Sequence, residues 1–376
     1  MTYHTEDLSF GLSLLSGIRG NATLSPTIIR TALAMLYEGA RGETAGEIAR
    51  VAKIPVEDAV KNLEFKKLVG SVNAFSAQPC KLRFANGVWV GQQYGIRADF
   101  SSTLADIYRA EVKSADFERN AEGERTGINQ WVSENTEGKI PTLFGQGSID
   151  STTPLVLATV LYFKGERQDK FNPRNTQRQE YALHGQMVQV EMMRQGRIDG
   201  RDQLPKFQYG EFDGVQVVKL PYRGRKIATT LLLPPHRTPL STLETRLKNE
   251  AIVVNDGDMS SREFARLEVP KHELRSSLDL VSLLSAMGIR KMFDFAADFS
   301  GISEEPLFVG SGRHEAYFKT DEEGSEGAAA TGFKLSCGGI KVQKPVEFVA
   351  DRPFLEIVTH VDTGAVLFLN RVEDPR

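Results

Sequence analysis

The sequence has little cysteine, almost no net charge and no long apolar run. Its two cysteines, Cys80 and Cys337, are too few for a disulfide scaffold or a structural zinc site. A formal net charge of −3 gives no reason to expect nucleic acid or an acidic membrane surface as the main partner. No apolar run approaches the roughly 20 residues of a membrane-spanning helix. We therefore expect a soluble protein with two free thiols, and a disulfide between them is the alternative.

The first seven residues, Met1 to Asp7, lack the basic start and the apolar core of a signal peptide. This absence predicts a cytoplasmic protein, with secretion as the alternative. A small group of lysines, Lys61, Lys66 and Lys67, predicts the solvated face of a helix. A site for a polyanion is the more specific alternative for these lysines.

The sequence also lacks the common motifs of enzymes. There is no Gly-x-Ser-x-Gly elbow, no phosphate-binding loop and no His-Glu-x-x-His motif. The six histidines are scattered, and none lies at metal-ligand spacing from another. The acidic run 255–258 lacks the later glutamate of an EF-hand, so it predicts a turn. We therefore expect no catalytic residue, no metal and no cofactor.

Helical and strand patterns alternate along the chain without a regular βαβ rhythm. Apolar spacing predicts helices over 27–39, 43–51, 100–108, from about 129 to Gly138, and 278–287. It predicts strands over 81–85 and 88–90, 154–163, 215–220, 227–233, 264–269, 315–319, 346–349, 354–360 and 366–369. No linker or repeat divides the chain. The pattern predicts one α+β domain that spans residues 1–376.

One segment, 321–339, is rich in glycine and alanine and lies between two expected strands. A flexible linker is the simplest interpretation, but loops of this length are uncommon in compact domains. The side chains alternate in character, because the odd positions are small or apolar and the even positions carry charges at both ends of the run. The odd positions are Ser325, Gly327, Ala329, Thr331 and Phe333, and the even positions are Glu326, Ala328, Ala330, Gly332 and Lys334.

In an extended chain, these two sets of side chains face opposite sides. The segment could therefore enter a crowded sheet as a strand with a small buried face and a polar outer face. Each backbone hydrogen bond gained would contribute about 0.5–1.5 kcal/mol, so ten inserted residues would release several kcal/mol. The uninserted state would then persist because of a kinetic barrier.

Several motifs resemble those of the serpin family. The run Glu322-Glu323-Gly324-Ser325-Glu326-Gly327-Ala328-Ala329-Ala330-Thr331 resembles the serpin hinge, and we expect 322–332 to be the mobile hinge of a protease-inhibitor loop. Further resemblances lie in 21–26 (Asn-Ala-Thr-Leu-Ser-Pro), 86–90 (Asn-Gly-Val-Trp-Val), 128–132 with 136–140, 162–165 (Tyr-Phe-Lys-Gly) and 351–354 (Asp-Arg-Pro-Phe). The resemblance thus covers nearly the whole chain.

The resemblance implies a serpin fold with three β-sheets, about nine helices and an exposed reactive-centre loop at about 322–345. It also implies suicide inhibition, in which a serine protease forms a covalent acyl complex and the cleaved loop inserts into the main sheet. We expect a monomer that supplies no catalytic residue. Two alternatives are a non-inhibitory serpin that acts as a binding or chaperone protein, and an inhibitor of cysteine proteases.

The family pattern also places the bond that the protease would cleave. Counting from Glu322 puts the reactive bond between Gly338 and Gly339, and a shift in register would move it to Cys337, Ile340 or Lys341. Glycine at this position favours a broad-specificity protease, whereas Lys341 would favour a trypsin-like enzyme.

The resemblance implies a further set of residues where the sheet opens. Lys271 and Glu322 match positions that form an ion pair at the top of the sheet, and two unrelated surface charges are the alternative. His314 matches a histidine that bonds to a serine, here Ser25, and to an asparagine, here replaced by Thr159. The chain departs from the family pattern at three more positions: Ile28 replaces a second serine, Arg167 replaces a tryptophan, and Gly327 replaces an alanine.

Overall fold

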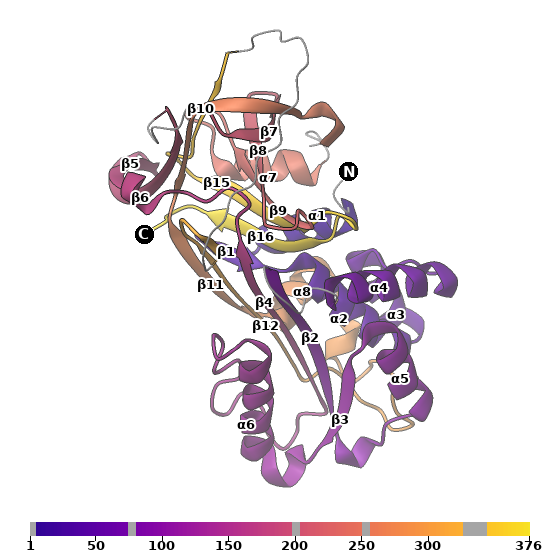
Figure 1. Ribbon diagram of the computed structural model, residues 1–376. Helices are drawn as coiled ribbons and strands as arrows, with labels where there is room; N and C mark the ends of the chain where they lie inside the picture. Colours follow the sequence, from indigo (N-terminus) through magenta and orange to yellow (C-terminus); the bar gives the residue numbers. More distant parts are fainter. Residues whose placement is uncertain (1–4, 74–79, 198–203, 250–255, 326–343) are drawn as a thin grey trace.

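The computed structural model describes residues 5–73, 80–197, 204–249, 256–325 and 344–376. The helices are α1 (Thr5–Leu15), α2 (Pro26–Gly39), α3 (Gly42–Ala52), α4 (Asp58–Asn73), α5 (Ala98–Thr103), α6 (Phe117–Asn135), α7 (Leu240–Lys248) and α8 (Leu280–Met287). Long strands run diagonally through the molecule, with α6 on one side and α2, α3 and α4 on the other (Figure 1). The architecture is a mixed α+β fold, as the sequence predicts.

A six-stranded sheet forms the long diagonal of the molecule. It consists of β11 (His272–Asp279), β12 (Ser311–Thr320), β4 (Leu155–Glu166), β2 (Cys80–Gly91) and β3 (Glu111–Ala115) in that order, with β13 (Gly324–Ser325) attached to β4. Side chains on one face pack with α2 in the main hydrophobic core, and those on the other face pack with α6. Burial on both faces explains the continuous apolar run of β4.

The second sheet has ten strands and consists of two parts joined by β10. One part has β1 (Ala22–Leu24), β16 (Val366–Val372), β15 (Phe354–His360), β9 (Ile227–Leu233), β8 (Val215–Pro221) and β7 (Lys206–Phe212). The other part has β10 (Ser260–Pro270), β6 (Gln186–Gly196), β5 (Gln177–Leu183) and β14 (Val346–Val349). Together with the six-stranded sheet, these parts form the three sheets that the family resemblance implies.

Local sequence explains most element ends, and some predicted ends were wrong. The Ser25 hydroxyl caps α2, with Pro26 in the first turn, and Gly288 ends α8 with a φ of 102°. The helix predicted over 278–287 begins at Leu280, because residues 278 and 279 belong to β11. The helix predicted over 100–108 becomes a π-helix at Leu104. The two short strands predicted at 81–90 are one strand, β2.

The lysines near α4 do not form the common solvated face that the sequence predicts. Lys61 is buried and pairs with Glu38 and Asp58, so its charge is neutralised inside the protein. Lys66 pairs with Asp106 at the surface. Two of the three lysines are therefore engaged by carboxylates, and the structure gives no support to a polyanion site here.

Candidate functional site: the fork in the sheet and the loop hinge

The six-stranded sheet contains a fork between two of its central strands. Parallel strands β4 and β12 pair from Val156 with Ser311 up to Leu161 with Ala316, and no further pairs join them above this point. At the top of β4, the two residues of β13 pair antiparallel with it, Gly324 with Glu166 and Ser325 with Gly165. The beginning of an additional strand therefore lies at the open end of the fork.

A tight turn leads the chain from β12 into β13. The backbone groups of Asp321 and Gly324 exchange two hydrogen bonds, and the amide of Arg167 donates to the carbonyl of Glu323. Gly324 has a φ of +117°, and a Cβ placed on it would lie 2.5 Å from the Arg167 nitrogen. This position needs glycine for both its backbone angle and its close approach to the chain after β4.

Glu322 is held at the base of this turn by two polar partners. Its Oε2 lies 3.1 Å from Nζ of Lys271, and its Oε1 accepts a hydrogen bond of 2.7 Å from the Thr176 hydroxyl. Burial opposes ionisation of Glu322, but the bonds from Thr176 and Lys271 outweigh it and lower the pKa of the carboxyl. Thr176 was not among the residues singled out from the sequence, because a threonine in a turn carries no distinctive signal.

His314 lies within the paired part of the fork, level with Thr159, where it connects three elements. Its Nε2 accepts a hydrogen bond from the backbone amide of Ser25, and its Nδ1 lies 2.9 Å from the Thr159 hydroxyl. Burial lowers the pKa of His314 to about 4, so the ring is neutral at pH 7. The resemblance implied a bond to a serine without naming the atom. The structure uses the amide of Ser25, whose hydroxyl caps α2 instead.

A buried polar cluster lies beneath the hinge and was missed by the sequence analysis. Arg167 is 1% exposed, and its Nη2 makes one long bond of 3.4 Å to the Thr320 hydroxyl. Thr320 in turn lies 3.4 Å from the buried Glu356, which accepts a 3.0 Å bond from His272. The replacement of the expected tryptophan by Arg167 was the only sequence signal for this cluster.

Two donor atoms of Arg167, Nε and Nη1, have no hydrogen-bond partner among the described residues. The guanidinium instead lies over the ring of Tyr222, with 5.6 Å between its central carbon and the ring centroid. A buried charge with unmet donors destabilises the folded state. The side chain of Arg167 therefore stabilises the region under the hinge less than a fully hydrogen-bonded arginine would.

The predicted reactive bond at Gly338 and Gly339, its alternatives Cys337, Ile340 and Lys341, and the hinge beyond Ser325 lie outside the described residues. Cys80 is a free thiol, and burial raises its pKa to about 11. Within the described residues, no group of three or more potential ligands could hold a metal ion. None of the described helices is long and apolar enough to span a bilayer.

Comparison with known proteins adds independent evidence. A family model described as "Serpin (serine protease inhibitor)" matches residues 9–375. The chain is 34% identical over 366 residues to leukocyte elastase inhibitor of Bos taurus, covering 95% of this chain and 93% of the relative. It is 31% identical to an uncharacterized serpin-like protein of Thermococcus kodakarensis, covering 96% of this chain and 82% of the relative.

Solved serpin structures also resemble this chain over nearly its whole length. The crystal structure of Serpin48 from the insect Tenebrio molitor has a TM-score of 0.83 at 26% identity, with 99% of this chain and 97% of that chain covered. Native protease nexin-1, solved with heparin, has a TM-score of 0.81 at 28% identity, with 99% of both chains covered. The family model over nearly the whole chain and these similarities show that the chain belongs to the serpin family.

Proposed function

We propose that this chain inhibits a serine protease by a suicide mechanism in which its cleaved loop inserts between β4 and β12. One observation carries the proposal: β13 pairs with β4 above the last β4–β12 pair, where a further strand would begin. The turn at Asp321 and the ion pair between Lys271 and Glu322 hold this starting point in place. Insertion would extend a strand that has already begun.

In the proposed reaction, the serine oxygen of the protease bonds to the carbonyl carbon of Gly338. The Gly338–Gly339 bond breaks, and the amine of Gly339 leaves with a proton. Insertion then carries the ester-linked protease along the sheet, and distortion of its active site prevents water from completing hydrolysis. The chain acts as a monomer and contributes the loop and the sheet, whereas the protease contributes the catalytic groups.

The register of β13 supports insertion of the hinge with its small face inward. Gly324 pairs with Glu166 and Ser325 with Gly165, so each further residue of the loop moves one residue back along β4. Continued in this way, Thr331 comes level with Thr159. Insertion would separate Thr159 from His314, and the Thr331 hydroxyl would arrive between them to replace the lost bond.

The test is to mix the protein with elastase, chymotrypsin, trypsin or subtilisin and to look for an SDS-stable complex. Elastase comes first, because four of the relatives are named leukocyte elastase inhibitor and glycine suits a protease that accepts small residues. We expect a stable complex, and mass spectrometry of the released peptide to identify the cleaved bond. Cleavage without a complex, and without a rise in thermal stability, would contradict the proposal.

A pair of loop variants tests the direction of insertion. Gly165, the partner of Ser325, faces Phe163 and Tyr222 in the apolar interior, so Ser325→Arg would bring a charge there. We expect Ser325→Arg to abolish trapping and to leave the protein a substrate. Glu326→Arg is the matched control, because the alternation of the sequence would put the same side chain on the outer face of an inserted strand. Normal trapping by Ser325→Arg would refute the hinge assignment.

A further inference from the structure

The hinge carries two adjacent carboxylates, and a lysine holds each of them from a different direction. Lys271, which pairs with Glu322, directly precedes β11, and β11 pairs with β12. Lys170 lies shortly after the end of β4, and its Nζ is 2.6 Å from Oε2 of Glu323. The family resemblance supplies the first of these pairs, because it matches Lys271 and Glu322. It does not supply the second pair, which joins the hinge to the β4 side of the fork.

The backbone of Lys170 is fixed by contacts on both sides of it. Its carbonyl accepts a hydrogen bond of 2.6 Å from the side chain of Gln195, which is buried in β6. The next residue, Phe171, is buried in the hydrophobic cluster that contains Phe264, and its amide donates to the carbonyl of Glu322. The lysine side chain is 15% exposed, so it lies partly inside the protein. These contacts hold the ammonium group of Lys170 within reach of the hinge.

The ammonium group of Lys170 lies between two carboxylates that belong to paired segments. Besides Glu323, it lies 3.6 Å from Oε2 of Glu166, the last residue of β4. Glu166 pairs in the sheet with Gly324, so the two carboxylates flank the first pair of β13 with β4. Without a cation between them, these negative charges would repel each other across that pair. Arg223 offsets only part of this repulsion, because its Nη1 lies 2.8 Å from Oε2 of Glu166.

From this arrangement, we infer that Lys170 is a positioning residue that keeps β13 paired with β4 and so favours insertion over simple cleavage. The inference rests on the proposed function and adds a residue that sets its efficiency. Once the protease has formed its ester bond, two processes compete. Water can add to the ester carbonyl, which releases the serine hydroxyl of the protease and leaves a carboxylate on the cleaved chain, or the loop can extend β13.

Lys170 acts on this competition through the strand and takes no part in the chemical step. Insertion extends the β13 pair, so a loss of that pairing delays insertion and gives hydrolysis more time. Recognition and acylation precede this stage, and the association rate with the protease should therefore not depend on Lys170. The quantity that reports its role is the ratio of cleaved chain to SDS-stable complex.

Variants of the pair test this role, with the protease that the wild type traps. Lys170→Met leaves Glu323 and Glu166 facing each other, so we expect the ratio to rise about threefold, as the loss of one partly exposed ion pair would give. Lys170→Arg keeps the charge and should restore the wild-type ratio. Adding Glu323→Gln to Lys170→Met removes one of the facing carboxylates and should recover part of the loss.

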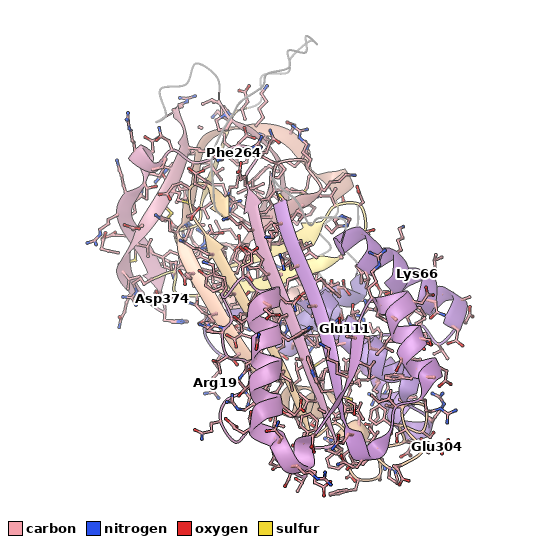
Figure 2. All side chains as sticks on the ribbon, turned by 60° about the horizontal axis from the view of Figure 1, so that its bottom comes forward. Arg19, Lys66, Glu111, Phe264, Glu304 and Asp374 are labelled. Carbon is pink, nitrogen blue, oxygen red and sulfur yellow. The ribbon has the colours of Figure 1, made fainter. Side chains whose placement is uncertain are left out.

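Lys66→Met is the matched control for the loss of a lysine–carboxylate pair. Lys66 lies 3.0 Å from Asp106, but it belongs to α4 (Figure 2). We expect Lys66→Met to give the wild-type ratio, because its ion pair lies outside the hinge. SDS gels measure the ratio for every variant.

Hydrogen exchange of the uncleaved protein measures the pairing of β13 without any protease. The amide of Arg167 donates to the carbonyl of Glu323, and β13 pairs with Gly165 and Glu166. We expect the amides of residues 165–167 and 323–325 to exchange about threefold faster in Lys170→Met than in the wild type. Lys170→Arg and Lys66→Met should keep the wild-type exchange rates.

The outcomes separate failure of the inference from failure of the proposed function. If the wild type forms a stable complex but Lys170→Met keeps the wild-type ratio or the wild-type exchange rates, the role of Lys170 is refuted and the proposed function stands. If the wild type forms no SDS-stable complex with any protease, the proposed function fails and the inference fails with it. A slower association rate for Lys170→Met, at an unchanged ratio, would also contradict the inference, because Lys170 would then act before acylation.

Discussion

Two arginines are equally buried in this protein, yet their surroundings differ sharply. Arg30 of α2 and Arg167 after β4 are each 1% exposed. Arg30 bonds to the carboxylates of Asp7 and Glu64 and to the backbone carbonyls of Ala52 and Lys53. Arg167 makes one long bond to a hydroxyl and leaves two donor atoms without partners among the described residues.

The difference separates a region whose buried arginine is fully bonded from the region that the proposed reaction would open. The network of Arg30 joins α1, α2 and α4, and a satisfied buried ion pair makes rearrangement there costly. Arg167 lies under the turn from which β13 begins, where the proposed reaction needs the sheet to open. Unmet donors weaken the resistance to opening at this place.

The largest expected effect is at Arg30. Replacing Arg30 by methionine leaves Asp7 buried without its cation, so we expect the free energy of unfolding to fall by about 3–5 kcal/mol. Denaturant unfolding of the uncleaved protein measures this change. Arg19→Met, at an exposed arginine (Figure 2), is the control and should change stability by about 0.5 kcal/mol or less. A loss below about 1 kcal/mol for Arg30→Met would show that the bonded Arg30 contributes little to stability, contrary to the difference drawn between the two arginines.

His314 is a third buried basic residue, and it differs from both arginines because its ring is neutral at pH 7. Its pKa falls from 6.5 to about 4 on folding, so the unfolded chain binds the proton more readily. Above pH 6.5, neutral His314 does not reduce the free energy of unfolding. As the pH falls toward 4, protonation of this histidine in the unfolded chain lowers the free energy of unfolding, by about 3 kcal/mol in total.

Denaturant unfolding at a series of pH values between 7 and 4 measures the loss at His314. His184→Gln, at an exposed histidine, should keep most of the wild-type dependence, whereas His314→Gln should flatten it. If His314→Gln leaves the pH profile unchanged, the loss arises from other groups.

The smallest effect, and the one of opposite sign, is expected at Arg167. Arg167→Met removes a buried charge and its unmet donors; it also removes a favourable charge near the buried Glu356, which keeps its bonds from His272 and Asn370. We expect the free energy of unfolding to stay unchanged or to rise by about 1 kcal/mol. The measurement is the same denaturant titration. A loss as large as that of Arg30→Met would show that ordered water satisfies the donors of Arg167 and that the two regions are alike.

The sequence predicted more of the fold than of the site. Regular patterns found β4, β15 and α2, because apolar spacing and capping residues are local properties. The strand β11 was missed, since its alternation continues into α8 without a break that the sequence reveals. The prediction of a common solvated face for the lysines of α4 was wrong, because Lys61 is buried and pairs with Glu38 of α2.

The sequence alone predicts the hinge, because the alternation of small and charged residues after Glu322 is a property of neighbouring positions; beyond Ser325 this stays a prediction, since those residues lie outside the described ones. That Gly324 is a turn residue follows from the structure, where its φ is +117°. Only the tertiary structure decided that Thr176 bonds to Glu322, which atom of Ser25 meets His314, and that Arg167 has a single long bond to Thr320. These contacts join residues more than a hundred positions apart, so they depend on the register and packing of whole strands, which local patterns do not specify.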